Sequence, residues 1–278
     1  MRKKISIALL VLGMLAAASM GLEKTQSNQA WQSAAPAAPE IDEWQILPRE
    51  GSEDVHVYPV LTLTGAEAIE EIQGALYTEE REIIGGEFEI VDGTGARFWP
   101  YQVLQPGHTY EWSVQVNGTA MTHFFTVSAM ALPDEWIEVS LGTQQWVRIW
   151  QGGQVTQQFP CSGGLPDSPS LLGVFELQER GESFYSHRFC EGARYWIRIQ
   201  DQFLFHSVPR DKQQHMIQSE LDKIGTAASH GCIRLKDEDA QWLYEQMPEG
   251  TMVIIHPAVS DPVGEAICFL EKQFESPK

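Results

Sequence analysis

The sequence predicts a mainly β protein made of two β-rich modules with one or two short helices. Apolar and polar residues alternate in short runs such as Tyr110–Val116, the period-two pattern of half-buried strands. Glycine turns at Asn117-Gly118 and Gly152-Gly153 separate consecutive runs, as in β-hairpins. A helical spacing of apolar residues, i, i+3, i+4 and i+7, occurs in residues 237–247, before Pro248.

Composition narrows the class of protein further. The 278 residues are long enough for two domains, and a hydrophobic content of 43% with nine tryptophans indicates packed cores. The formal net charge of −19 excludes nucleic acid as a partner, because phosphate binding needs a basic face. It also disfavours binding to an anionic membrane surface.

The N-terminus has the pattern of an export signal. Basic residues at 2–4 precede an apolar run over 5–18, which ends in small residues. The run is shorter than the roughly 20 residues that span a bilayer, but residues 20–22 could extend it. We therefore expect residues 1–22 to be a cleaved signal peptide or a retained signal-anchor, which leaves the protein extracytoplasmic, either secreted or membrane-anchored. Residues 23–43, rich in Pro, Ala, Ser and Gln, are a predicted linker.

Residues 44–130 form the first predicted β module. Strands are expected over 57–64 and 87–91, and a hairpin over 110–127. Thr64 with Glu67 has the spacing of a capping box and predicts a short helix through residue 72.

The segment Leu104-Gln-Pro-Gly-His-Thr-Tyr110 in this module resembles the turn that enters a late strand of bacterial immunoglobulin-like and fibronectin-type modules. The resemblance implies an immunoglobulin-like β-sandwich. Such a module can serve as a spacer or bind the cell wall, and the sequence leaves both roles open.

The second predicted module, residues 134–258, contains a potentially reactive thiol. Cys232 lies in Ser229-His230-Gly231-Cys232-Ile233-Arg234, and His206-Ser207 lies 26 residues upstream. A free cysteine has a pKa of about 8.5, so it needs a neighbouring base to become a nucleophile at neutral pH. Strands are expected at 137–141, 146–150, 154–156 and 252–255, with a turn between the second and the third.

These two motifs resemble those of the bacterial L,D-transpeptidase catalytic domain, and the likeness covers roughly Trp136 to Pro257. The resemblance implies a β-sandwich-type catalytic domain with Cys232 as the nucleophile and His206 as the base. It also implies that the carbonyl or hydroxyl of Ser207 orients the imidazole. One departure is Ser170-Leu-Leu-Gly-Val-Phe175, where the family usually has Thr-Pro-Thr-Gly-x-Phe.

Other residues are candidates for substrate contacts. The main-chain N–H groups of Gly231 and Cys232 are the expected oxyanion donors. Arg234 could bind a substrate carboxylate or hold its own loop in place, and the sequence does not choose. Candidate substrate-binding residues are Ser229, His230, Arg234, Tyr195 and Trp196. A helical piece over 217–224, ended by Gly225, is expected to border the cleft as a lid.

Two further types of site were considered. A zinc site at His206, His230, Cys232 and His256 is not expected, because no typical Cys-x2-4-Cys or His-x3-5-His pair is present. No cofactor is expected either.

Four cysteines, Cys161, Cys190, Cys232 and Cys268, occur in the chain. If Cys232 is the nucleophile, it must stay reduced. Cys161 and Cys190 could form a disulfide, and the sequence does not decide whether they do.

The favoured function is an exported L,D-transpeptidase that forms peptidoglycan cross-links through a cysteine acyl-enzyme. The resemblance implies a donor stem tetrapeptide, cleaved before its terminal D-alanine, and an amine acceptor on a neighbouring stem. With water as the acceptor, the same residues would make an L,D-carboxypeptidase. The rival class is a non-catalytic wall-binding protein. Residues 259–278 are a predicted C-terminal tail.

Overall fold

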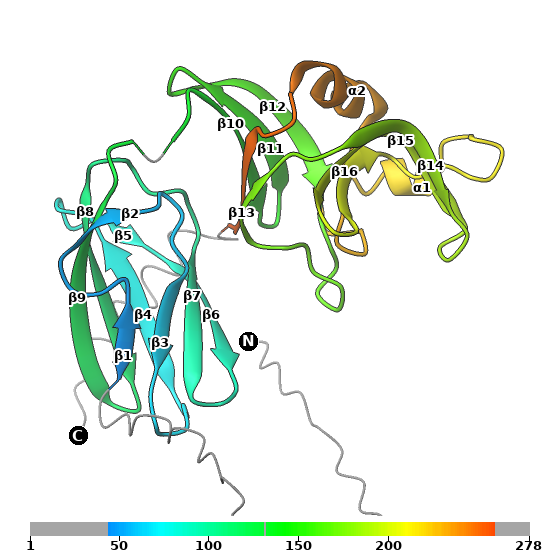
Figure 1. Cartoon of the computed structure of the whole chain (residues 1–278). Coiled ribbons are helices and arrows are strands. Elements are labelled where there is room, and N and C mark those ends of the chain that lie inside the picture. The colour runs from blue at the N-terminus through cyan, green and yellow to red at the C-terminus, as the bar shows by residue number, and fades with distance from the viewer. Residues whose placement is uncertain (1–43, 131, 259–278) are drawn as a thin grey trace, which may run out of the picture. The chain divides into compact units, whose positions relative to one another are not determined.

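The computed structural model describes residues 44–130 and 132–258, and its described part contains 18 strands and two helices (Figure 1). The mainly β class predicted from the sequence is confirmed. The predicted signal segment, linker and C-terminal tail lie outside the described residues. Within the described ranges, no helix is long and apolar enough to span a membrane.

The first module consists of two sheets. The first has the order β1-β3-β7-β6 and the second the order β2-β9-β8-β4-β5. The strands of the first sheet are β1 (Gln45–Leu47), β3 (Leu61–Thr64), β6 (Gly86–Val91) and β7 (Gly95–Pro100). Those of the second are β2 (Ser52–Val55), β4 (Ile72–Tyr77), β5 (Ile83–Ile84), β8 (Thr109–Val116) and β9 (Thr119–Val127).

The β8–β9 hairpin confirms the alternation that predicted it. Every second residue of β8, from Tyr110 to Val116, is buried in the core of the module. Asn117 and Gly118 connect the strands with positive φ angles of 48° and 84°, as a primed hairpin turn requires. The Tyr110 hydroxyl accepts a hydrogen bond from the Gln105 N–H at 2.8 Å, so the tyrosine fastens the turn that precedes its strand.

The helix predicted after Thr64 is wrong. The N–H groups of Gly65 and Ile69 donate to Thr94 and Gly93, in the turn between β6 and β7, and are therefore not free for a helix. Ile72 begins β4 and pairs with Val116. The strand predicted over 57–64 is also shorter, because β3 begins only at Leu61, after Pro59, which has no N–H to donate.

The second module is built on one nine-stranded sheet of order β13-β18-β10-β11-β12-β17-β16-β15-β14. Its strands are β10 (Glu135–Leu141), β11 (Gln145–Gln151), β12 (Gln154–Ser162), β13 (Gly173–Glu176), β14 (Arg180–Ser186), β15 (Glu191–Gln200), β16 (Phe203–Ser207), β17 (Ile233–Leu235) and β18 (Met252–Pro257). The strands predicted in this module are all present.

Both helices belong to the second module. Helix α2 (Asp237–Gln246) buries Ala240 and Leu243 and packs against β15 and β16 (Figure 1). Helix α1 (Gln218–Leu221) is only four residues long and buries none of them. The helical piece predicted over 217–224 is thus reduced to about one turn followed by hydrogen-bonded turns, and Gly225 follows with a φ of 106°.

Candidate active site

Strand β16 positions His206. Successive side chains of a strand point to opposite faces, so Phe205 enters the core of the module while His206 points to the other face. His206 is 6% exposed, and the Phe184 ring packs nearly perpendicular to the imidazole, with the ring centres 5.6 Å apart. Its Nδ1 lies 2.6 Å from the Ser207 carbonyl oxygen. A carbonyl only accepts, so Nδ1 carries the proton and Nε2 is left as the basic atom.

Burial, the largest cause, and the nearby Arg234 guanidinium together lower the pKa of His206 to about 4, against the bond to Ser207, which raises it. The ring is therefore neutral at pH 7. A neutral imidazole can accept a proton from a thiol, which a general base must do.

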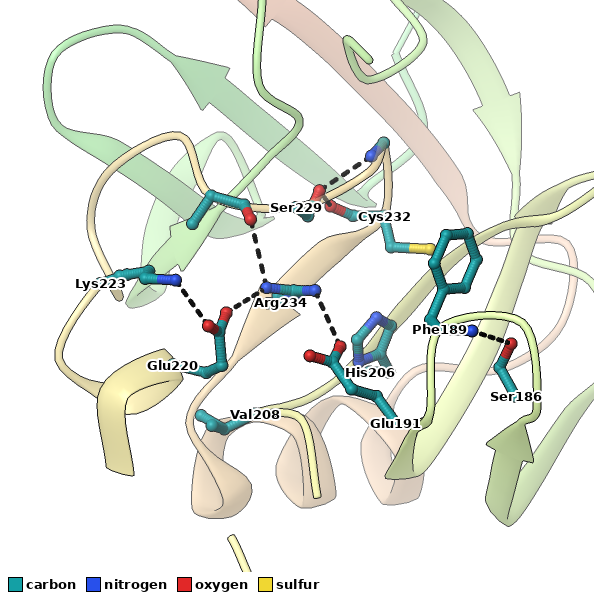
Figure 2. Close-up of polar contacts among 12 residues, drawn as sticks. Ser186, Phe189, Glu191, His206, Val208, Glu220, Lys223, Ser229, Cys232 and Arg234 are labelled. Atoms are coloured by element: carbon teal, nitrogen blue, oxygen red, sulfur yellow. Dashed lines mark hydrogen bonds and ion pairs between the residues drawn. The ribbon is translucent and has the colours of Figure 1, made fainter. Parts of the chain in front are cut away.

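The parallel pairing of β16 with β17 brings the two sequence motifs together. Phe205 pairs with Ile233, and His206 pairs with Arg234. Cys232 directly precedes Ile233, so it lies two positions along the strand pair from His206, and the thiol and the imidazole are neighbours in Figure 2. Strand pairing thus makes neighbours of residues that are 26 positions apart.

The Cys232 thiol is held in its neutral form. Burial raises its pKa, and the Leu204 backbone hydrogen bond and the Arg234 charge oppose this rise. The thiol contacts the Gln202 carbonyl oxygen at 3.6 Å rather than the imidazole. The resting site therefore holds a neutral thiol and a neutral imidazole, and a proton must move when the sulfur attacks.

Ser229 shapes the loop that carries the thiol. Its hydroxyl accepts the Gly231 N–H at 3.0 Å and donates to the Cys232 carbonyl at 2.6 Å. Gly231 has a φ of 117°, and a Cβ there would lie 2.5 Å from a Phe203 ring carbon. Glycine is therefore required at this position. Because its N–H is already bonded, the Cys232 N–H is the remaining candidate oxyanion donor of the predicted pair.

His230 is exposed, and its ring stacks on Phe189 with centroids 4.8 Å apart. Phe189 belongs to the loop between β14 and β15 and lies beside the Cys232 sulfur in Figure 2. Sequence reasoning missed Phe189, because no spacing links this loop to the motif around the thiol.

The predicted aromatic pair Tyr195 and Trp196 lies elsewhere on β15. The Tyr195 ring packs against the core and lies 5.8 Å from that of Tyr244 in α2. Trp196 lies beneath the Arg198 guanidinium, 5.7 Å from its ring centre. Within the described ranges, the ring contacts of these two residues are with Tyr244 and Arg198, and not with Cys232 or His206.

Arg234 is buried and forms ion pairs with two carboxylates. Its Nη1 donates to Glu220 at 2.6 Å and to the Ala228 carbonyl at 3.2 Å. Its Nη2 donates to Glu191 at 3.5 Å (Figure 2). Sequence reasoning named the arginine but neither glutamate, because no spacing along the chain links Glu191 or Glu220 to Arg234.

The remaining titratable candidates are placed apart from the thiol. His256 bonds Glu138 at 3.0 Å. Cys161, Cys190 and Cys232 are free thiols, with Cys161 buried and Cys190 exposed. Among the described residues, no group of three or more His, Cys, Asp or Glu side chains is arranged to hold a metal ion.

Comparison with known proteins assigns the second module. Residues 134–255 match the YkuD family, described as the L,D-transpeptidase catalytic domain. This module is an L,D-transpeptidase catalytic domain. The match includes His206, Cys232 and Arg234.

Two curated relatives agree with the assignment. The chain is 44% identical over 126 residues to the putative L,D-transpeptidase YciB of Bacillus subtilis (strain 168), covering 43% of this chain and 64% of that protein. It is 20% identical over 200 residues to L,D-transpeptidase 2 of Mycobacterium tuberculosis (strain CDC 1551 / Oshkosh), covering 61% of this chain and 44% of that protein. The chain thus spans less than two thirds of either relative.

Solved structures with some likeness include an L,D-transpeptidase from Mycobacterium tuberculosis H37Rv. That match has a TM-score of 0.37 and 19% identity, and covers 76% of this chain and 96% of that one. An L,D-transpeptidase from Mycobacterium smegmatis matches with a TM-score of 0.35 and 18% identity, covering 76% and 97%.

Proposed function

We propose that the catalytic domain transfers an acyl group between peptidoglycan stem peptides through a thioester on Cys232. The observation that carries this proposal is the placement of the thiol beside an imidazole whose Nδ1 is fixed by Ser207. The other nitrogen, Nε2, has no hydrogen-bond partner among the described residues. It can therefore take the proton of Cys232.

In the acylation half, the thiol proton moves to Nε2 of His206 as the sulfur attacks the carbonyl of the third stem residue. The carbonyl oxygen becomes an oxyanion, which the Cys232 N–H is placed to stabilise. The intermediate collapses when the C–N bond breaks and the proton passes from His206 to the leaving nitrogen. D-Alanine departs with a free amine, and a thioester remains on Cys232.

In the second half, a side-chain amine of another stem attacks the thioester. His206 accepts the amine proton and returns it to the departing sulfur, so the enzyme is restored and an amide cross-link forms. Water in place of the amine would release a tripeptide, which is the L,D-carboxypeptidase reaction. The two reactions use the same residues and differ only in the acceptor.

We further propose that the chain acts outside the cytoplasm, because its N-terminal residues have the pattern of an export signal. Residues 44–130 are proposed to be an immunoglobulin-like spacer that precedes the catalytic domain. The Tyr110–Gln105 hydrogen bond supports this proposal, because a tyrosine bonded to the backbone just upstream is typical of such modules.

The experiment uses the chain from residue 23 onward, mixed with a disaccharide-tetrapeptide and followed by mass spectrometry. Dimers formed with loss of D-alanine, together with an acyl adduct on Cys232, are expected. The Cys232→Ala variant should form neither. Tripeptide without dimer would show a carboxypeptidase instead. If the native chain gave no product and no adduct, the domain would be a wall-binding protein.

A further inference from the structure

The buried guanidinium of Arg234 joins three separate chain segments next to the proposed nucleophile and base. Arg234 lies on β17, directly across the strand pair from His206. Its side chain is 7% exposed. Its nitrogens reach Glu220 on α1, the Ala228 carbonyl just before the thiol loop, and Glu191 at the start of β15 (Figure 2).

Polar contacts hold the α1 end of this network, among them a hydrogen bond from the Ser162 hydroxyl to the Lys223 carbonyl and one from the Ile217 N–H to the Pro209 carbonyl. Helix α1 is four residues long and has no buried residue, so it lacks an apolar anchor. Glu220 is instead clamped between two cations, with Arg234 at 2.6 Å and Lys223 at 2.5 Å. Its side chain is 13% exposed, and an ion pair this well shielded is screened far less by salt than a surface pair.

The other end of the network is the β14–β15 hairpin. Glu191 is the first residue of β15 and pairs with Ser186, where the hairpin loop opens. The same loop carries Phe189, which stacks on His230. Arg234 is thus bonded to the base of the loop whose Phe189 stacks on His230, two residues before the thiol.

Three of the five N–H donors of Arg234 are used inside the protein, and its side chain is only 7% exposed. Nη1 serves Glu220 and the Ala228 carbonyl, Nη2 serves Glu191, and Nε is buried without a partner. A guanidinium can bridge two carboxylates because its N–H groups form a planar fork, which the single ammonium of lysine cannot reproduce. A substrate carboxylate would have to displace one of these glutamates to reach it.

We propose that Arg234 is a positioning residue that ties the α1 segment and the β14–β15 hairpin to the thiol loop through Glu220 and Glu191, and is not a ligand of the substrate carboxylate. Its role in turnover rests on the function proposed above. The tethered charge has a second consequence, because it lowers the pKa of both His206 and Cys232. The charged and titratable groups around it are Glu191, Glu220, Lys223, His206 and Cys232.

The test compares Glu220→Gln, Arg234→Gln and Arg234→Lys in the chain from residue 23 onward, with Glu249→Gln as the matched control. Glu249 is exposed in the turn before β18, so the same chemical change there should alter nothing. Hydrogen exchange of the amides in 217–224 reports the tether, and the amides of β10 report global unfolding. If Arg234→Gln fails to fold, Glu220→Gln carries the test alone.

Glu220→Gln should raise amide exchange in 217–224 by about tenfold or more while β10 stays protected. The double variant Glu220→Gln/Arg234→Gln should raise amide exchange little beyond either single variant, because both substitutions break the same Arg234–Glu220 ion pair. In turnover, kcat should fall by about 10- to 100-fold with KM little changed, because the loss is one of positioning. The rate of Cys232 alkylation by iodoacetamide is measured against pH by peptide mass spectrometry. Because the Arg234 charge lowers the pKa of Cys232, this pH profile should move to higher pH in Arg234→Gln, and by less in Arg234→Lys.

Two results would overturn the tether. One is unchanged exchange in 217–224 for Glu220→Gln. The other is a raised KM at constant kcat for Arg234→Lys, with Glu220→Gln like the native chain, which would make Arg234 a substrate ligand. Exchange and alkylation need no substrate, so expected results there, with no turnover by the native chain, would support the tether and refute the proposed function.

Discussion

Two buried histidines of the catalytic domain, His206 and His256, have the same local geometry and different surroundings. Each lies at the end of a strand and holds its ring by a bond from Nδ1 to the carbonyl of the next residue, at 2.6 Å for His206 and 2.7 Å for His256. The exposed fractions are 6% and 2%. The difference is at Nε2, which has no partner among the described residues in His206 and bonds Glu138 in His256.

The partner of Nε2 decides what each ring can do. Burial tends to raise the pKa of Glu138, but its bonds to His256 and Trp150 and the charge of Arg148 outweigh burial and lower it. Glu138 is therefore a carboxylate that only accepts hydrogen bonds, so Nε2 of His256 serves as the donor to it. That nitrogen is then not available to take a proton from a substrate or a thiol, whereas Nε2 of His206 is. Local backbone geometry alone does not make a histidine a base.

The largest expected effect is a loss of activity on substitution of His206 that substitution of His256 does not cause. His206→Gln should lower kcat/KM of the tetrapeptide reaction by about 10²- to 10⁴-fold, the usual contribution of a general base. His256→Gln should leave the kcat of the folded enzyme close to that of the native chain. Equal losses in both variants, after correction for the folded fraction, would contradict the comparison.

For the free energy of unfolding, in contrast to activity, the surroundings of His256 are expected to matter strongly. Glu138→Ala removes the acceptor for His256, Trp150 and Arg148, and leaves buried charge unpaired. Breaking a buried ion pair from one side typically costs about 3–5 kcal/mol of unfolding free energy. Urea unfolding measures this loss, and Glu176→Ala on exposed β13 is the control. A loss no larger than that of the control would show that the pair is not structural.

A pH dependence should follow from the low pKa of His206. The acid limb of kcat/KM should lie near pH 4, since the base stays neutral until its pKa of about 4 is reached. A limb near pH 6.5 would contradict the burial of this ring. Initial rates between pH 3.5 and 8 are the measurement, with the wild-type stability checked at each pH.

The same shift has a consequence for stability. Between pH 6.5 and 4 the unfolded chain binds a proton at His206 that the folded chain does not, so stability falls as the pH falls through this window. The contribution is about 3 kcal/mol between pH 7 and pH 4. His206→Gln should therefore lose less unfolding free energy than the native chain over this range, and equal losses would contradict it.

The smallest effect concerns how the ring of His206 is held. His256 is oriented by the carbonyl of Pro257, which has no hydroxyl, so the carbonyl alone is sufficient. Ser207→Ala should therefore keep kcat/KM and the acid limb. It should cost about 1–3 kcal/mol of stability, because the Arg194 N–H loses the hydroxyl it donates to. A loss of activity as large as that of His206→Gln would assign the orienting role to the hydroxyl.

Much of the fold could be predicted from the sequence where the signal is local. The hairpin around Asn117-Gly118 and the helix over 237–246 follow from turn chemistry and from periodicity, which act between residues close in the chain. The helix predicted after Thr64 failed for the opposite reason. Its amides bond a turn that lies more than twenty residues further along the chain, and no local pattern reports that contact.

The sequence by itself determined which chemistry is proposed for the site, because the thiol motif and His206-Ser207 are short patterns whose residue types suit a cysteine nucleophile and a base. Only the tertiary structure decided which histidine has a free nitrogen, that the Gly231 N–H is occupied by Ser229, and that Arg234 pairs with Glu191 and Glu220. These contacts join segments that parallel strand pairing and loop packing bring together. Hydrogen bonds and ion pairs act through space, so their partners are set by the fold rather than by spacing along the chain.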